Sequence, residues 1–131
     1  LIFNATTWNL IAENDSTSPA TDLYLSLHTA DPGVGGAQTT NETAYTNYVR
    51  IAVARTTGGW DAPASGATAN AALAQFAQCG VTGATLTHVA IGTDAAGAGL
   101  VLYAGALTSS LAVANGIQPQ FAAGALDISE A

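Results

Sequence analysis

The stretch LYLSLHTADPG, residues 23–33, decides the fold class, because it joins a period of two to an abrupt turn. Leu23, Leu25 and Leu27 alternate with other residues, as in a strand that buries one face. The Asp-Pro-Gly sequence at 31–33 has the chemistry of a β-turn. Proline sets φ at the second position, and glycine accepts a positive φ. The stretch therefore predicts a β-strand that ends in a turn.

Similar runs follow along the chain. Residues 49–53 alternate in the same way, and residues 84–93 are rich in β-branched side chains. Residues 68–78 are rich in alanine, which favours a helix by propensity alone. Their setting among turn signals instead favours a strand that contains Leu73 and ends near Phe76. Further short strands are predicted at 100–107, 111–114 and 121–128. We therefore predict an all-β fold, a jelly-roll-like β-sandwich of about seven or eight strands.

The first part of the chain has a different pattern. Apolar residues at 1–3 and 10–11 bracket a polar run with a spacing closer to a helix than to a strand. Residues 13–22 are polar and contain a proline, as in a surface loop. The 131 residues are enough for one domain. We predict an N-terminal helical segment and loop at 1–22, followed by a single β-sandwich domain at 23–131.

The charge balance limits the possible partners. Nine acidic residues face only two arginines and no lysine, which gives a formal charge of −7. Nucleic acids and anionic membranes are bound by lysine and arginine, so we expect neither as a partner. No run approaches the roughly 20 apolar residues of a membrane span. Charged residues make up 8% of the chain. An uncharged surface is cheap to desolvate, which favours contacts with other proteins.

Catalytic and metal sites find little support in the sequence. A zinc site built from His28, His88 and carboxylates is arithmetically possible, but the two histidines are 60 positions apart and form no close ligand pair. The acidic residues are scattered, so no carboxylate pair of a glycosidase is indicated. The glycine-rich residues 92–99 are interpreted as a hairpin connection, and the lone Cys79 as a buried packing residue. We therefore expect no enzyme, no metal, no cofactor and no small-molecule substrate.

The two arginines lie at the ends of one predicted strand. Arg55 shares the parity of the apolar positions and is interpreted as a strand-end residue that extends into solvent. Arg50 can form a bidentate pair with an acid of the same chain or of a neighbour. We expect Arg50 to contribute to an assembly contact.

Four motifs in the first half of the chain form a long and specific pattern: HTADPG at 28–33, QTTNE at 38–42, AYTNY at 44–48 and RIAVAR at 50–55. With these motifs, and with residues 87–129, the chain resembles a family of small tailed-bacteriophage virion proteins. Members are commonly labelled tail-fibre or structural proteins, and some resemble capsid cement (decoration) proteins with a jelly-roll-like body. The family supplies no catalytic residues, and His28 and Asp31 match it as part of the strand and turn.

The resemblance implies a non-enzymatic capsid cement protein that binds the outer surface of the head and bridges capsid subunits. The alternative is a tail-fibre or adsorption component that binds a host receptor. A third hypothesis, a tail-associated glycan hydrolase, would need clustered carboxylates. Expected partners are the major capsid protein and further copies of the chain, in a homodimer or other homo-oligomer. The protein would be made in the host cytoplasm and located on the capsid, or else on the tail.

The predicted contact residues lie in two places. The long polar connection at 30–48 carries tyrosines that suit interface anchors, and assembly proteins often bind through a terminal segment. The candidate interface residues are Phe3, Trp8, Thr39, Asn41, Glu42, Tyr45, Tyr48 and Arg50.

Overall fold

The structure is a computed structural model, and it describes residues 20–130. Eight strands succeed one another along the chain, and residues 20–130 contain no helix. The strands are β1 (Asp22–His28), β2 (Ile51–Ala54), β3 (Ala67–Ala69), β4 (Ala74–Gln75), β5 (Ala84–Gly92), β6 (Val101–Val113), β7 (Gln120–Phe121) and β8 (Asp127–Ser129). The predicted helical segment, with Phe3 and Trp8, lies outside the described residues.

The main layer is a four-stranded antiparallel sheet with the strand order β2-β1-β5-β6. Its register places apolar residues opposite one another on one face, because Leu25 pairs with both Ile51 and Ile91. Ile91 in turn pairs with Tyr103 on β6. Directly paired residues point to the same side of a sheet, so this face is the one that packs against the core.

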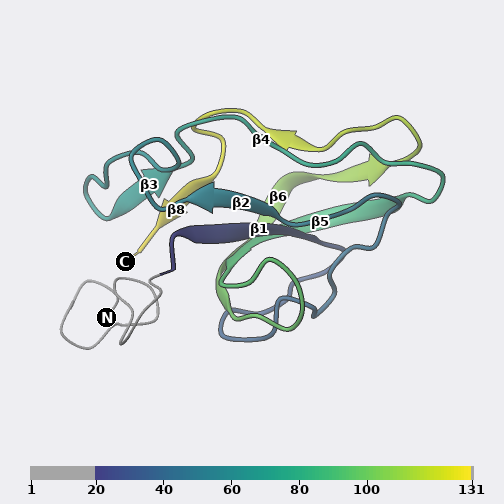
Figure 1. Cartoon of the computed structure of the whole chain (residues 1–131), viewed down its shortest axis with the longest axis horizontal. Coiled ribbons are helices and arrows are strands. Elements are labelled where there is room, and N and C mark those ends of the chain that lie inside the picture. The colour runs from purple at the N-terminus through teal and green to yellow at the C-terminus, as the bar shows by residue number, and fades with distance from the viewer. Residues whose placement is uncertain (1–19, 131) are drawn as a thin grey trace.

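The second layer consists of two short antiparallel pairs, β3 with β8 and β4 with β7. Figure 1 shows the segment that carries β4 above the sheet, while the β1–β2 connection and the β5–β6 hairpin lie below it. Phe76, which is 1% exposed, packs between the layers with Leu25, Leu27, Leu86 and other buried residues. The core is built from few but well-buried residues. Full burial of one large apolar side chain contributes about 1.5–3 kcal/mol to stability.

The all-β class predicted from the sequence is confirmed, and all of its strand pairs are antiparallel. The predicted jelly-roll arrangement is not confirmed. A jelly roll has two sheets of comparable size, whereas the second layer here consists of two short strand pairs. The strand predicted at 84–93 is confirmed as β5, and the glycine-rich residues after it form the predicted hairpin connection to β6.

Three strand boundaries were predicted wrongly. The single strand at 68–78 is broken into β3 and β4, because Leu73 is 54% exposed in the turn between them. The strands at 100–107 and 111–114 form one continuous β6 with an irregular register. The run 121–128 contains β7 and β8 joined by a turn in which Gly124 has a positive φ. Turn residues inside apolar runs account for the breaks within 68–78 and within 121–128.

Candidate functional site

The connection between β1 and β2, residues 29–50, is fixed against the sheet by main-chain hydrogen bonds. The Thr43 amide donates to the Leu27 carbonyl (2.9 Å), and the Thr29 amide donates to the Asn41 carbonyl (2.9 Å). These bonds flank a β-bridge between His28 and Glu42. The connection therefore folds back along the end of β1, and an ordered main chain sets the positions of its side chains.

A bidentate ion pair braces this connection from within. Arg50 donates from Nε to Oε1 of Glu42 and from Nη2 to Oε2, both at 2.7 Å. The Tyr48 hydroxyl also donates to Glu42 Oε1 (2.8 Å), and it accepts a hydrogen bond from the Leu27 amide (3.1 Å). The hydrogen bond to Glu42 raises the pKa of Arg50 further above its ordinary value. The arrangement keeps both charges paired where water has little access.

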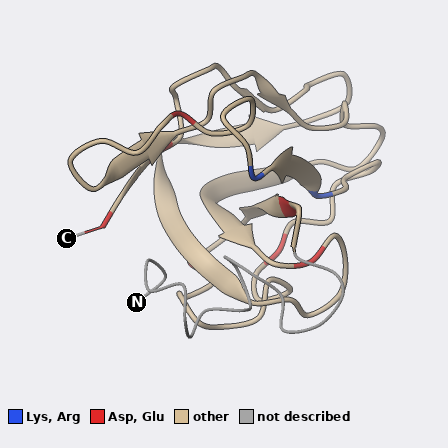
Figure 2. Ribbon diagram, turned by 60° about the vertical axis from the view of Figure 1, so that its left-hand side comes forward, with Lys and Arg blue, Asp and Glu red and all other residues tan. Residues whose placement is uncertain are grey.

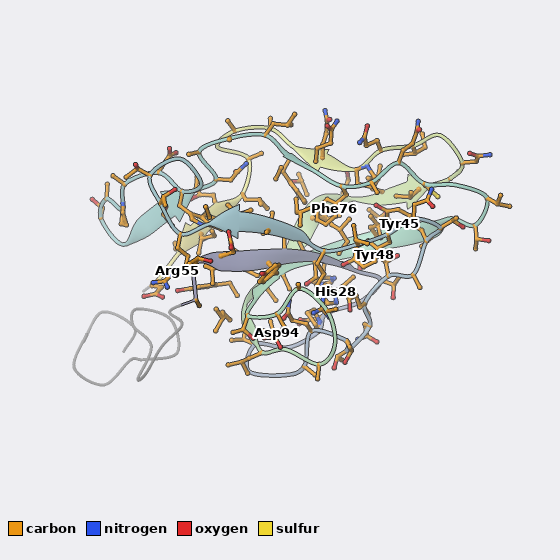
Figure 3. All side chains as sticks on the ribbon, viewed as in Figure 1. His28, Tyr45, Tyr48, Arg55, Phe76 and Asp94 are labelled. Atoms are coloured by element: carbon orange, nitrogen blue, oxygen red, sulfur yellow. The ribbon has the colours of Figure 1, made fainter. Side chains whose placement is uncertain are left out.

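The same guanidinium reaches the β5–β6 hairpin. Arg50 donates from Nη1 to the Asp94 carbonyl (2.9 Å) and from Nη2 to the Gly97 carbonyl (2.7 Å). Figure 3 shows Asp94 and His28 on the side of the sheet away from Phe76. One side chain thus joins the β1–β2 connection to the hairpin.

Aromatic side chains hold the far end of the connection in the core. Tyr45 and Tyr48 meet edge to face with their ring centroids 5.3 Å apart, and Tyr48 stacks on Phe76 at 6.2 Å. Figure 3 shows the three residues together. The Tyr45 hydroxyl donates to the Ala77 carbonyl (2.8 Å), and burial raises the pKa of Tyr45 to about 12. Tyr45 is 2% exposed and therefore belongs to the core of the chain.

These positions correct part of the predicted contact surface. Thr39 and Asn41 are exposed, whereas Glu42, Tyr48 and Arg50 are only partly accessible and bind one another. The acidic partner expected for Arg50 lies in the same chain, so the ion pair is an internal brace. Tyr45 is not available as a surface anchor, because its ring is buried and its hydroxyl is bonded internally. The exposed side chains of the connection include Val34, Thr39, Thr40, Asn41, Asn47 and Val49.

Gln38 is a structural residue that the sequence analysis missed. It is fully buried, and its Oε1 accepts a hydrogen bond from the Asp94 amide (2.9 Å). Its amide group fits against Gly92 and Gly99, where a Cβ atom at either position would overlap it. The first and last glycines of the hairpin sequence GTDAAGAG, Gly92 and Gly99, were the available signal, since glycine often marks close approach of another group.

His28 and Ser26 form a buried hydroxyl–histidine arrangement that resembles part of a catalytic site. The Ser26 hydroxyl lies 2.8 Å from Nε2 of His28, and Nδ1 lies 2.9 Å from the Thr40 carbonyl. A carbonyl can only accept, so Nδ1 carries the proton and Nε2 accepts from the serine. Burial is the main cause that lowers the pKa of His28. Both residues are 0% exposed, so no substrate can reach the hydroxyl, and the pair is structural.

The zinc site considered for His28 and His88 lacks a third ligand among residues 20–130. His28 and His88 are direct cross-strand partners in β1 and β5, which the sequence alone did not reveal. Yet residues 20–130 contain no group of three or more histidine, cysteine or acidic side chains placed to hold a metal ion. Cys79 is buried and free, as predicted, and its thiol lies 3.3 Å from the Thr82 carbonyl. No helix in this part of the chain is long and apolar enough to span a membrane.

An antiparallel β-fold with an ordered connection whose exposed side chains are mostly uncharged has the features of a structural or binding module. A family model described as podophage GP4 fiber I protein gp80 matches residues 3–129. This match covers nearly the whole chain, so the chain belongs to that family and is a bacteriophage virion structural protein. A search of curated proteins finds no significant match.

Proposed function

We propose that the chain is a non-enzymatic fibre component of the phage virion that acts through protein–protein contacts of its β1–β2 connection. The observation that carries this proposal is the Glu42–Arg50 brace, which fixes the connection while its exposed side chains stay largely uncharged. A preordered loop loses little entropy on binding, and an uncharged one is cheap to desolvate. The family description favours the fibre over the capsid.

The capsid cement role expected from the sequence is the second candidate. Its support is the composition, because a lysine-free chain with 8% charged residues suits repeated contacts over a closed lattice. In that role the partner would be the major capsid protein on the outer surface of the head. In the fibre role the partners would be tail proteins and a host receptor. Further copies of the chain are partners in both roles.

The first experiment measures the molar ratio of this chain to the major capsid protein in purified virions, by quantitative mass spectrometry. A few copies per particle supports the fibre role. A ratio near one, or a simple fraction of one, contradicts the fibre role and supports the cement role, because a cement protein covers a lattice.

The contact surface is tested by incorporation of variants into virions. Thr39→Arg places a charge on the exposed connection and is expected to reduce incorporation at least several-fold. Thr57→Arg is the matched control, because Thr57 is an exposed threonine beyond β2. Equal incorporation of the two variants would contradict the assignment of the connection as the contact surface. Both variants should first show the unfolding midpoint of the parent.

A further inference from the structure

A hollow of about 340 Å³ lies between the main sheet and the β3–β8 pair, at the end of the sheet where β1 begins. Leu23, Ile91 and Tyr103 line it from the sheet, and Ala67 and Ile128 line it from β3 and β8. Figure 1 shows β8 close to the start of β1. A second hollow, of about 450 Å³, shares Ile91, Tyr103 and Ile128 with the first. Close-packed interiors contain few voids larger than a water molecule, so residues 20–130 leave room here for further side chains.

The polar groups in the walls of the first hollow are few, and most are bonded within the chain. Thr68 Oγ1 donates to the Asp61 carbonyl (2.7 Å), and the Tyr103 hydroxyl donates to Glu130. The exception is Trp60, whose buried Nε1–H has no acceptor among residues 20–130. A buried indole N–H usually has a partner. The hollow therefore fits an apolar occupant that brings one acceptor, rather than a ligand rich in hydroxyls, which would leave its own polar groups unpaired.

Residues 1–12 have the composition that this hollow requires. Their sequence, LIFNATTWNLIA, contains six large apolar residues and no charged side chain. Every peptide unit of such a segment also offers a main-chain carbonyl that can accept a hydrogen bond from the indole of Trp60. The residues that follow, ENDSTSP at 13–19, are polar and carry two acids. The first twelve residues therefore suit burial, and the next seven suit a linker.

The start of β1 holds this linker next to the hollow. The Arg55 amide donates to the Thr21 carbonyl (2.8 Å), and Arg55 Nη1 donates to the Ala20 carbonyl (2.6 Å). Figure 3 shows Arg55 at the end of the sheet where β1 begins. Leu23 lines the hollow and is three residues from Ala20, so the two positions are separated by roughly 10 Å at most. The seven linker residues span up to roughly 23 Å when extended, which is enough to return residues 1–12 to the hollow.

Charge and tethering select the chain's own segment over that of a second copy. Two copies with a formal charge of −7 each repel one another. Figure 2 shows how few basic residues the described chain has to offset this repulsion. A segment tethered by a short linker, in contrast, is present at the hollow at a millimolar effective concentration. Binding within one chain is therefore favoured at any dilution.

We propose that residues 1–12 pack into this hollow of their own chain, with large apolar side chains against its walls and a main-chain carbonyl that accepts from Trp60 Nε1. Phe3 and Trp8, which were expected to contact a partner, then belong to the core of the chain itself. The β1–β2 connection takes no part in this packing. Failure of this inference therefore leaves the proposed function unchanged, and the copy number in virions tests that function separately.

Acrylamide quenching of Trp60 fluorescence in the full chain tests the packing. Trp8→Phe leaves Trp60 as the only tryptophan and serves as the parent. In this background Leu10→Asp should raise the quenching constant of Trp60 about twofold or more, because a buried carboxylate is costly and the segment leaves the hollow. Thr17→Asp is the matched control, since it adds the same charge to the linker, and it should leave the constant unchanged. The eight strands lie within residues 22–129, so neither substitution alters a strand.

Nuclear Overhauser effects in the isotope-labelled full chain give a direct second result. The indole protons of Trp60 should show cross-peaks to methyl groups of residues 1–12, and Leu10→Asp should remove them. Absence of these cross-peaks in the parent overturns the proposal, because the hollow is then open. Equal quenching constants for Leu10→Asp and Thr17→Asp also overturn it. Cross-peaks and protection of Trp60 that disappear on dilution would assign the occupant to a second copy, and so contradict packing within one chain.

Discussion

Arg50 and Glu42 form a bidentate pair in which two guanidinium nitrogens each lie 2.7 Å from a different carboxylate oxygen. The side chains are only 3% and 14% exposed, so the pair is largely shielded from water. Arg50 also donates to the Asp94 and Gly97 carbonyls of the β5–β6 hairpin. The β1–β2 connection, the approach to β2 and the hairpin are therefore held by one side chain.

Removal of this arginine should be costly. Arg50→Ala leaves the Glu42 carboxylate shielded and without its cationic partner, and loss of one member of a buried pair costs about 3–5 kcal/mol. We expect a loss of about 3 kcal/mol in the free energy of unfolding, since Glu42 keeps some contact with water and its bond to Tyr48. Urea denaturation followed by circular dichroism measures the change.

Arg55→Ala provides the comparison for Arg50. Arg55 is partly exposed and donates one side-chain hydrogen bond, to the Ala20 carbonyl at 2.6 Å. Its removal should cost about 1 kcal/mol. The double variant Glu42→Ala/Arg50→Ala should lose less than the sum of its two single variants, because neither charge is then left alone. Equal losses for Arg50→Ala and Arg55→Ala would show that the pair does not brace the connection.

His28 should make the stability of the protein depend on pH. Burial lowers its pKa below the ordinary 6.5, so the folded state favours the neutral ring. Above pH 6.5 the unfolded state is also neutral, and this contribution to stability is fully present. As the pH falls below 6.5 the unfolded state binds the proton first, and stability is lost until the pH reaches the folded pKa. The loss is at most about 1.4 kcal/mol per pH unit.

The urea midpoint at pH 7.5 and at pH 5.5 measures this dependence. His28→Gln should be less stable than the parent at pH 7.5 but should lose less of its stability at pH 5.5. His88→Gln is the control, because His88 is the cross-strand partner of His28 and is less deeply buried. If His28→Gln kept the full pH dependence of the parent, the titrating group would lie elsewhere in the chain.

The strands that the sequence predicted well are those with a simple period. β1 and β5 have alternating or β-branched residues and few glycines inside them, so local pattern and tertiary packing agree. The alanine-rich residues 68–78 have a weak pattern, because alanine fits either face of a strand. Their break at Leu73 is set by which short strand each half pairs with, β8 for β3 and β7 for β4. Such long-range pairing is not encoded in a local period.

The candidate site was harder to predict, because its residues act across the fold. Tyr45 and Tyr48 were expected at the surface since they lie in a polar connection. Tyr48 instead stacks on Phe76, which is about thirty residues away in the sequence, and Tyr45 packs edge to face on Tyr48. His28 has the strand parity expected for the face opposite the leucines. The β1–β2 connection covers that face, however, and so buries the histidine. Parity gives the side of a sheet, and only the tertiary fold decides what covers it.

The close fit between Gln38 and Gly92 leads to a prediction about stability, because it leaves no room for a methyl group at position 92. A Cβ at position 92 would overlap the amide carbon of Gln38. Gly92→Ala should therefore displace Gln38 and its bond to the Asp94 amide, at a cost of about 1–3 kcal/mol in the free energy of unfolding. Gly105→Ala is the control and should cost little, since a Cβ there meets open space. Shortening the glutamine relieves the overlap, so Gly92→Ala should destabilise the Gln38→Ala background much less than the parent in the same urea titration. If Gly92→Ala cost the same in both backgrounds, the overlap with Gln38 would not be its cause.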